Sequence, residues 1–354
     1  MPNIPKLLDW YDKSHRDLPW RRTRDPYKIW LSEIILQQTR VDQGLSYYQA
    51  FVSHFPNIKL LAAANEDTVL KLWQGLGYYS RARNMHHTAK FITQELGGKF
   101  PDNYDDILKL KGVGPYTAAA ISSIVFDEVR PVMDGNVMRV ISRWFAILDA
   151  VDSSRGKKQI EALLNTLIDN QQPGKFNQAL MEFGATWCKP KNPDCTNCIF
   201  AEKCAAFKQK SVSELPVKKG KTRVRERFFY YLVFRFDDET GSFTLLKKRS
   251  DKDIWEGLYE FPLLELNAEL STDSVLNVPQ FNTLVNKDTD TIKHISQPMV
   301  HQLSHQKITA RFLMIESKKA PLNQSGHFLK VPVSELHKYP ISRLISKFLE
   351  SNPV

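Results

Sequence analysis

The chain has 354 residues, a length that suits two or three domains at about 150 residues each. Hydrophobic residues make up 42% and charged residues 25%, which is ordinary for a globular protein with packed cores. No stretch approaches the roughly 20 apolar residues that cross a bilayer, and residues 1–6 lack the apolar segment of a secretory signal. We therefore expect no membrane association and a cytoplasmic location.

The charge balance favours an anionic partner. Lys and Arg outnumber Asp and Glu by 49 to 39, which gives a formal net charge of +10. Cationic side chains release counterions from phosphates, so this surplus suits a nucleic acid. Many basic proteins bind no nucleic acid. On charge alone, a basic protein without a nucleic-acid partner is therefore an equally good interpretation.

Residues 1–206 carry a helical pattern. Apolar residues recur at helical spacing in three stretches, 29–35, 69–73 and 163–168. Turn residues separate the helical stretches at 55–57, 97–98 and 172–174. No run of alternating strands interrupts them, so the first 206 residues are predicted to form a mostly α region.

Two glycines join a pair of predicted helices at about residues 104–126. Gly112 and Gly114 flank Val113, and together they allow a tight turn with outward N–H groups. The N-terminus of the following helix adds a positive dipole, so a DNA phosphate fits there. A plain turn between two helices is the alternative.

The Cys residues are confined to one short segment. All four, Cys188, Cys195, Cys198 and Cys204, lie within 17 residues, which indicates a metal centre in a reducing compartment rather than disulfides. Structural zinc sites usually show two short Cys pairs, whereas this spacing has one CxxC pair with uneven flanks. One [4Fe–4S] cluster suits the spacing, and zinc is the alternative.

The pattern changes after the cysteines. Residues 207–225 are basic and poor in large apolar residues, which predicts an interdomain linker that either follows a DNA backbone or is a solvated tether. From 226 to 354 the pattern is α+β. Strands are predicted at 228–236, 242–249 and 308–315, and a closing helix at 341–350.

Two carboxylates are candidates for acid–base chemistry. Asp134 precedes Gly135 and a predicted helix, so it is either a helix N-cap, a catalytic group or both. Glu33 is the single acidic residue in an apolar helical stretch, which predicts a raised pKa and a role as proton donor. A surface glutamate on an amphipathic helix is the alternative for Glu33.

Three of these motifs together resemble one family. The helix-hairpin-helix, the Cys spacing and the Glu-(apolar)3-Gln-Gln-Thr motif at residues 33–39 resemble the MutY-type adenine DNA glycosylases of base-excision repair. The resemblance implies a helix-hairpin-helix glycosylase domain with a [4Fe–4S] cluster at 1–206, followed by a MutT-like (Nudix-like) domain at 226–354. It also implies a structural or DNA-sensing role for the cluster.

The resemblance assigns roles to four residues. Glu33 would protonate adenine at N7, and Asp134 would be the catalytic aspartate, supported through hydrogen bonds by Tyr116 and Asn136. Bifunctional relatives carry Lys at the position of Tyr116, because Schiff-base attack on the sugar needs an amine. A phenol cannot form an imine, so we expect a monofunctional glycosylase.

Further residues match the family's base pocket and its duplex-intruding groups. The pocket candidates are Arg16, Trp20, Arg21, Leu36 and Gln178, of which Gln178 would read the edge of adenine. Gln38 and Tyr78 match the residues that intrude into the duplex when a base is flipped. Ordinary helix packing is the alternative for Tyr78.

The second domain resembles MutT-like folds through Trp255–Pro262, but the pyrophosphohydrolase signature is absent, so we do not expect nucleotide hydrolysis. MutY enzymes recognise 8-oxoguanine partly through a Phe-Ser-His loop. Leu303, Ser304 and His305 match this loop with Leu in place of Phe, which removes the aromatic stacking. A polar β-turn is the alternative for the loop.

The expected substrate is double-stranded DNA that contains A:8-oxoG or A:G mispairs, bound by a monomer in the cytoplasm at the nucleoid. Two rivals remain. A bifunctional endonuclease III-like pyrimidine-lesion glycosylase is disfavoured by Tyr116. A non-catalytic iron–sulfur DNA-binding protein would not need both Glu33 and Asp134.

Overall fold

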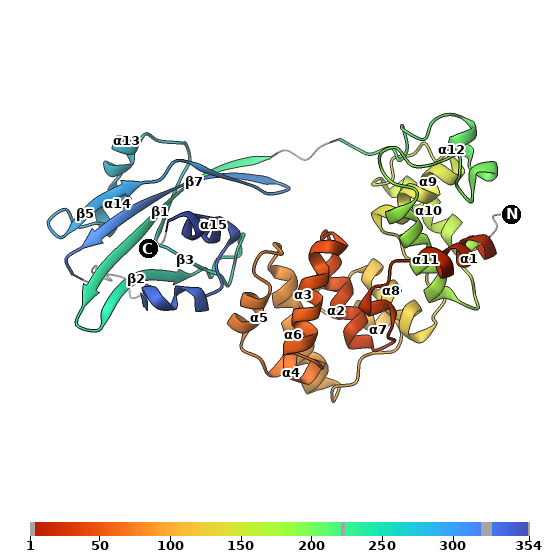
Figure 1. Ribbon diagram of the computed structural model, residues 1–354, viewed down its shortest axis with the longest axis horizontal. Coiled ribbons are helices and arrows are strands. Elements are labelled where there is room, and N and C mark those ends of the chain that lie inside the picture. Colours follow the sequence, from red (N-terminus) through yellow and green to blue (C-terminus); the bar gives the residue numbers. More distant parts are fainter. Residues whose placement is uncertain (1–3, 221–223, 320–327, 353–354) are drawn as a thin grey trace. The chain divides into compact units, whose positions relative to one another are not determined.

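The computed structural model describes residues 4–220, 224–319 and 328–352 (Figure 1). Its contacts divide the chain into two compact units, Met1–Ala63 with Asn84–Lys221, and Ala64–Arg83 with Thr222–Val354. Residues 1–3, and residues 221–223 of the predicted linker, lie outside the described residues. Within the described ranges, no helix is both long and apolar enough to cross a membrane.

The first unit is helical, which confirms the fold class predicted for this region. Its helices are α1 (Ile4–Ser14), α2 (Pro26–Leu36), α3 (Val41–His54), α4 (Ile58–Ala63), α6 (Ser80–Glu95, whose first turn belongs to the second unit), α7 (Tyr104–Leu108), α8 (Pro115–Phe126), α9 (Gly135–Phe145), α10 (Ser154–Leu167), α11 (Pro173–Thr186) and α12 (Ala205–Lys208), with short 3-10 turns η1 (Pro19–Arg21) and η2 (Ala201–Lys203). The predicted hairpin corresponds to α7 and α8, joined through the turn at Gly112.

Helix α11 is the scaffold of this unit, because it packs against α1, α8 and α9. Two glycines permit the close approach. A Cβ on Gly174 would lie 2.6 Å from the Ser123 carbonyl oxygen, and a Cβ on Gly184 would lie 2.9 Å from the Asn136 carbonyl oxygen. Larger side chains at these two positions would push α8 or α9 away.

Buried Asn177 on α11 ties down the segment that leads to α9. Its side chain accepts the Val132 N–H at 3.0 Å and donates to the Arg130 carbonyl at 2.7 Å and the Ser123 hydroxyl at 2.8 Å. An amide that satisfies three buried partners fixes the path of irregular backbone. Residues 130–132 therefore deliver Asp134 to the start of α9 in a defined position.

The second unit contains a mixed sheet. Its strands are β1 (Arg225–Asp238), β2 (Gly241–Lys248), β3 (Tyr259–Glu260), β4 (Leu263–Leu266), β5 (Asp290–Ile295), β6 (Met299–Gln302), β7 (Gln306–Ser317) and β8 (Leu329–Pro332). Strands β1 and β7 are parallel, and β2 and β4 pair antiparallel with β1. Strands β5 and β6 pair antiparallel with β7. The helices are α5 (Glu66–Leu72), α13 (Thr272–Leu276), α14 (Pro279–Leu284) and α15 (Arg343–Ser351), with the 3-10 turn η3 (Val333–Lys338).

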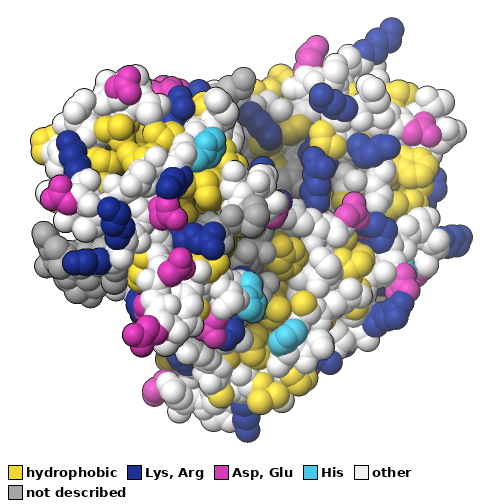
Figure 2. Space-filling model, turned by 60° about the vertical axis from the view of Figure 1, so that its left-hand side comes forward, with side chains coloured by type: hydrophobic (Ala, Val, Ile, Leu, Met, Phe, Trp, Pro, Cys, Tyr) yellow, Lys and Arg dark blue, Asp and Glu magenta, His cyan; other side chains and the backbone are white. Residues whose placement is uncertain are grey.

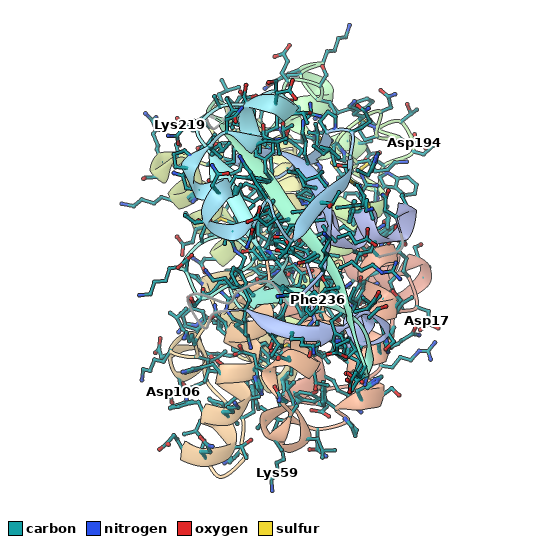
Figure 3. All side chains as sticks on the ribbon, turned by 90° about the vertical axis from the view of Figure 1, so that its left-hand side faces the viewer. Asp17, Lys59, Asp106, Asp194, Lys219 and Phe236 are labelled. Carbon is teal, nitrogen blue, oxygen red and sulfur yellow. The ribbon has the colours of Figure 1, made fainter. Side chains whose placement is uncertain are left out.

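Alternate side chains of β1 pack into two different hydrophobic layers. Tyr230, Leu232, Phe234 and Phe236 (the last labelled in Figure 3) pack with buried residues of α13 and α14. On the other face, Tyr231 stacks on a β7 phenylalanine that in turn stacks on α15. Successive side chains of a strand point to opposite faces of the sheet, and both faces of β1 are covered by helices. An almost continuous run of apolar residues can therefore be buried on this strand. These strands, and α15, confirm the α+β prediction.

Acidic residues of the Nudix-like segment are held in ion pairs. Glu260 is buried and accepts two hydrogen bonds from Arg249, at 2.9 and 2.8 Å, and a third from the Tyr231 hydroxyl. Asp253 pairs with Arg227 at 2.7 Å. These carboxylates stabilise the fold of the second unit.

Candidate active site

One cavity of about 170 Å³ in the first unit collects the predicted base pocket and the predicted catalytic residues. Its lining includes the following residues predicted from sequence: Arg16, Trp20, Arg21, Glu33, Leu36, Tyr116, Asp134, Asn136 and Gln178. They come from η1 and the segment before it, from α2, α8 and α11, and from the N-terminus of α9. Residues far apart in the sequence meet because α11 packs on α8 and α9. Gln38 is not among the lining residues that the structure describes.

Glu33 is buried near the middle of α2, at 8% exposure. The helix starts at Asp25, whose side chain accepts the Tyr27 N–H, and Pro26 follows at the first helical position. Burial raises the pKa of Glu33 to about 7, and a hydrogen bond with the Tyr116 hydroxyl offsets part of this rise. The carboxyl group can therefore be protonated near neutral pH, as the sequence predicted.

Asp134 caps helix α9 and also faces the cavity. Its carboxylate accepts the Val137 N–H at 2.7 Å and the Asn136 side-chain N–H at 2.8 Å. Burial raises its pKa, and these two hydrogen bonds oppose the rise because they stabilise the ionised form. Among the described residues, the hydroxyl of Tyr116 contacts Met181 and Glu33, whereas Asn136 is the side-chain partner of Asp134.

The two pocket arginines share a carboxylate that the sequence analysis did not identify. The Glu182 side chain is fully buried and binds Arg16 through both carboxylate oxygens, at 2.8 and 2.7 Å, and Arg21 at 2.6 Å. Burial would raise its pKa, but the bonds from Arg16 and Arg21 outweigh this effect and lower the pKa to about 2. Its position four residues after Gln178 on α11 was the available signal, since such residues share a helix face.

Gln178 has a partner behind the cavity. The Tyr11 hydroxyl, on α1, donates a hydrogen bond to Gln178 Oε1 at 3.2 Å. Tyr11 is 5% exposed, and the Arg21 guanidinium lies over its ring at 5.6 Å from the centroid. Tyr11 is not among the cavity-lining residues, and the sequence carried no signal for it.

A hydrogen-bonded chain runs from Asp134 to the Cys segment. Asn136, which donates to Asp134, accepts from Arg139 at 2.9 Å. Arg139 also donates to the Cys188 carbonyl oxygen at 2.9 Å and to the Gly184 carbonyl oxygen at 2.7 Å. Arg139 is buried, so these contacts hold α9, α11 and the Cys segment in one arrangement.

All four cysteines line one small cavity, together with Arg143. Arg143 is 3% exposed and donates to the carbonyl oxygens of Lys189, Pro190 and Leu215. It also lies 3.5 Å from the Cys188 sulfur. In the part of the chain that the structure describes, no three His, Cys, Asp or Glu side chains are placed to hold a single metal ion.

Nearby loop contacts shape this segment. Asp194, labelled in Figure 3, accepts hydrogen bonds from the Asn197 side chain, and the Asp194 carbonyl accepts from the Trp187 indole at 3.0 Å. The Phe200 N–H points to the Cys198 sulfur at 3.4 Å. Such N–H contacts suit a thiolate.

Both predicted duplex-intruding residues have left-handed backbone. Gln38 has φ of 57° and Tyr78 has φ of 44°, which are uncommon values for residues with side chains. Both side chains are exposed, Tyr78 at 44%. Residues held in such sparsely populated conformations cluster at functional sites, which makes both positions candidates for contact with DNA.

The predicted recognition loop connects β6 and β7 in the second unit. The Leu303 N–H donates to the Gln306 carbonyl at 2.8 Å, which closes a tight turn. Ser304 lies at the tip, 3.1 Å from His305 Nδ1, and accepts a hydrogen bond from the Tyr78 hydroxyl at 3.2 Å. One predicted intruding residue and the predicted recognition serine are therefore in contact within this unit.

The hairpin turn has the geometry of an anion site. Gly112 has φ of 83°, and a Cβ there would lie 2.7 Å from the Asn84 Cβ, so glycine is required. Gly114 caps α8 without a side-chain hydrogen bond, and Pro115 follows. The first N–H groups of α8 are thus left for another acceptor.

Comparisons with known proteins show the family of the chain. Residues 31–170 match the HhH-GPD superfamily of base excision DNA repair proteins, and residues 230–351 match the NUDIX domain. The chain is 35% identical over 300 residues to an adenine DNA glycosylase of Buchnera aphidicola subsp. Schizaphis graminum, a match that covers 84% of this chain and 83% of that one. The chain belongs to the adenine DNA glycosylase family.

More distant relatives extend the comparison. The human adenine DNA glycosylase is 33% identical over 355 residues, which cover 86% of this chain and 65% of that protein. A thermostable thymine-DNA glycosylase structure superposes with a TM-score of 0.54 and 29% identity, covering 58% of this chain and 95% of that one. These matches confirm the resemblance to the family and the two-part fold class drawn from the sequence.

The burial of Glu33 predicts a pH-dependent stability. Its pKa of about 7 lies above the ordinary value of 4.5, so between these pH values the unfolded chain has lost a proton that the folded chain keeps. The free energy of unfolding therefore falls as pH rises through this window. Relative to wild type, Glu33→Gln should gain about 2 kcal/mol more at pH 8 than at pH 5, measured by urea denaturation.

Glu161→Gln is the control for this measurement, because Glu161 lies on the exposed side of α10. Its stability should follow that of the wild type at both pH values. Equal stability differences for Glu33→Gln at pH 5 and pH 8 would show that the folded protein does not hold Glu33 protonated.

Proposed function

We propose that the protein is a monofunctional adenine DNA glycosylase, which hydrolyses the N-glycosidic bond of adenine opposite 8-oxoguanine, and opposite guanine, in duplex DNA. The observation that carries this proposal is the pair of carboxyl groups in one cavity. Glu33 is kept protonated by burial, while Asp134 receives hydrogen bonds that favour its ionised form. Two carboxyl groups in different environments can divide acid and electrostatic roles.

The reaction follows from this division. Glu33 donates its proton to N7 of a flipped-out adenine, which makes the base a better leaving group. The bond to the sugar then breaks with positive charge on the sugar ring, which the Asp134 carboxylate stabilises. Water completes the hydrolysis, and Asn136 keeps Asp134 in place throughout.

The pocket has groups that suit a purine. Trp20 supplies an apolar wall, and Gln178 supplies one donor and one acceptor. Arg16 and Arg21 supply cationic donors, and buried Glu182 accepts hydrogen bonds from both, which compensates one of their two positive charges. A neutral base would therefore face guanidinium groups that are fixed in place and partly compensated.

Tyr116 supports hydrolysis without strand cleavage. Its phenol occupies the place where a lysine would attack the sugar, and the lining of the described cavity includes no lysine. Without an amine nucleophile, no Schiff base can form and the strand is not cut.

The Cys segment suits a [4Fe–4S] cluster. Cys188, Cys195, Cys198 and Cys204 would hold the cluster as thiolates, and Arg143 places a buried positive charge beside them. When bound, the cluster would hold this loop in shape for DNA contact. Arg139 and Asn136 link the same loop to Asp134.

The second unit would read the base opposite adenine. Ser304 offers a hydroxyl at the tip of its turn, and Tyr78 lies in contact with it. Leu303 occupies the loop position where the family has an aromatic residue, so the loop would rely on hydrogen bonding and on Tyr78 for stacking.

The expected partner is mispaired duplex DNA. Lys and Arg side chains are scattered among Asp and Glu on the face drawn in Figure 2, and the net charge of +10 suits a phosphate backbone. The turn at Gly112, Val113 and Gly114 would bind one phosphate. We infer a monomer that acts on chromosomal DNA in the cytoplasm.

Replacing Glu33 tests the catalytic proposal. Glu33→Gln should abolish adenine release in single-turnover assays while leaving duplex affinity within about twofold, because the amide cannot donate a carboxyl proton. In the wild type, the rate should be highest below pH 7 and fall about tenfold per unit at higher pH, as Glu33 loses its proton. Full activity of Glu33→Gln would refute the assignment.

Borohydride trapping tests the absence of lyase chemistry. The wild-type protein, incubated with mispaired duplex and sodium borohydride, should give no covalent protein–DNA adduct on a denaturing gel, because Tyr116 cannot form an imine. A lysine-dependent glycosylase serves as the positive control. An adduct in the amount that this control forms would show a bifunctional enzyme.

An opposing-base assay tests the recognition of oxidised guanine. Adenine release should be fastest opposite 8-oxoguanine, slower opposite guanine and slowest opposite cytosine. Ser304→Ala should reduce the preference for 8-oxoguanine over guanine roughly threefold to tenfold, the value of one hydrogen bond. Ser334→Ala, at an exposed position of η3, is the control and should keep the preference. An unchanged preference in Ser304→Ala would remove the loop from the recognition mechanism.

A further inference from the structure

Gln178 can read adenine only if its amide group faces the base in one orientation. The Watson–Crick edge of adenine presents the N6 amino donor beside the N1 acceptor. An amide complements this edge when Oε1 accepts from N6 and Nε2 donates to N1. The flipped amide would place donor against donor and acceptor against acceptor.

The structure places a fixed donor on the rear of this amide. The Tyr11 hydroxyl donates to Gln178 Oε1 at 3.2 Å and leaves the second lone pair of that oxygen available toward the cavity. A flipped amide would turn Nε2 toward the same hydroxyl, which would then have to accept instead of donate. That contact is weaker, because a phenol oxygen shares a lone pair with its ring and is a poorer acceptor than its O–H is a donor.

Two further side chains contact the ring of Tyr11. The ring stacks on His15 with centroids 4.6 Å apart, and the Arg21 guanidinium lies over it at 5.6 Å. Arg21 is anchored in turn by the buried Glu182 carboxylate at 2.6 Å. These contacts hold the phenol ring in place next to Gln178.

We propose that Tyr11 is a positioning residue for base specificity: its hydroxyl orients the Gln178 amide so that the pocket accepts the 6-amino group of adenine. Tyr11 touches no substrate, because it is buried behind Gln178 and does not line the cavity. This inference rests on the proposed adenine glycosylase function and adds to it the group that selects the amino-substituted purine.

The test compares two bases opposite 8-oxoguanine in single-turnover assays, adenine and purine without the 6-amino group. Both carry N7 for Glu33, so a defect in catalysis or folding would slow both. Tyr11→Phe removes only the hydroxyl and should slow adenine release roughly threefold to tenfold, while purine release changes by less than about twofold. Equal slowing of both bases, or no slowing of adenine release, would overturn the proposal.

A double-mutant cycle supplies the second readout. Tyr11→Phe added to Gln178→Ala should have no further effect on the ratio of adenine to purine release, since there is no amide left to orient. Independent, multiplying effects would contradict the proposal. Tyr27→Phe is the matched control, because it removes another buried tyrosine hydroxyl from the same unit, one that donates to the Phe55 carbonyl. It should leave the ratio unchanged.

Failure of the proposed function can be distinguished from failure of the role proposed for Tyr11. If the wild type released no adenine from any mispaired duplex, the proposed function would fail. If the wild type released adenine and Tyr11→Phe kept the wild-type ratio, only the role of Tyr11 would fail.

Discussion

The site depends on the burial of one carboxyl group beside another that is hydrogen-bonded. Glu33 lies in a nearly apolar helix, and removing water from a carboxyl group penalises its ionised form. Asp134 is also desolvated, but its carboxylate accepts hydrogen bonds from Val137 and Asn136 at the start of its own helix. Glu33 has no equivalent of these bonds within its own helix. The two carboxyl groups therefore differ in their hydrogen bonding because of their position in the fold: Glu33 lies mid-helix and Asp134 lies at a helix N-terminus.

The position of Asp134 at the N-terminus of α9 ties a carboxylate of the cavity to the folding of that helix. The capping bond that starts α9 is made by the same carboxylate that faces the cavity, so the aspartate is held without a dedicated clamp. Asn136 and Arg139 then extend the contact to the Cys188 carbonyl. A cluster held by the cysteines would thus stabilise the very segment that positions Asp134.

Much of this arrangement could be predicted from sequence, where the pattern is local. Helical periodicity, the Gly112 turn, the strands at 228–236 and 308–315, and Glu33 in its apolar stretch all follow from neighbouring residues. The partners of Glu182 and Tyr11 could not be predicted in this way. Glu182 binds Arg16, 166 residues away, and Tyr11 binds a residue 167 positions away, so only the packing of α1 and η1 against α11 reveals them.

The missed residues share a physical property that explains why they matter. Arg21 without a counter-ion would favour anions in the cavity and disfavour a cationic group there. Glu182 forms ion pairs with both Arg21 and Arg16, so it compensates part of their combined charge and holds the Arg21 guanidinium in place. Because the Glu182 carboxylate is fully buried, its removal would leave two uncompensated cations at the wall of the cavity. The free-energy cost of these buried cations would exceed the contribution that such ion pairs make when they are exposed to water. The arginine and glutamine side chains of the cavity are therefore held in position by Glu182 and Tyr11.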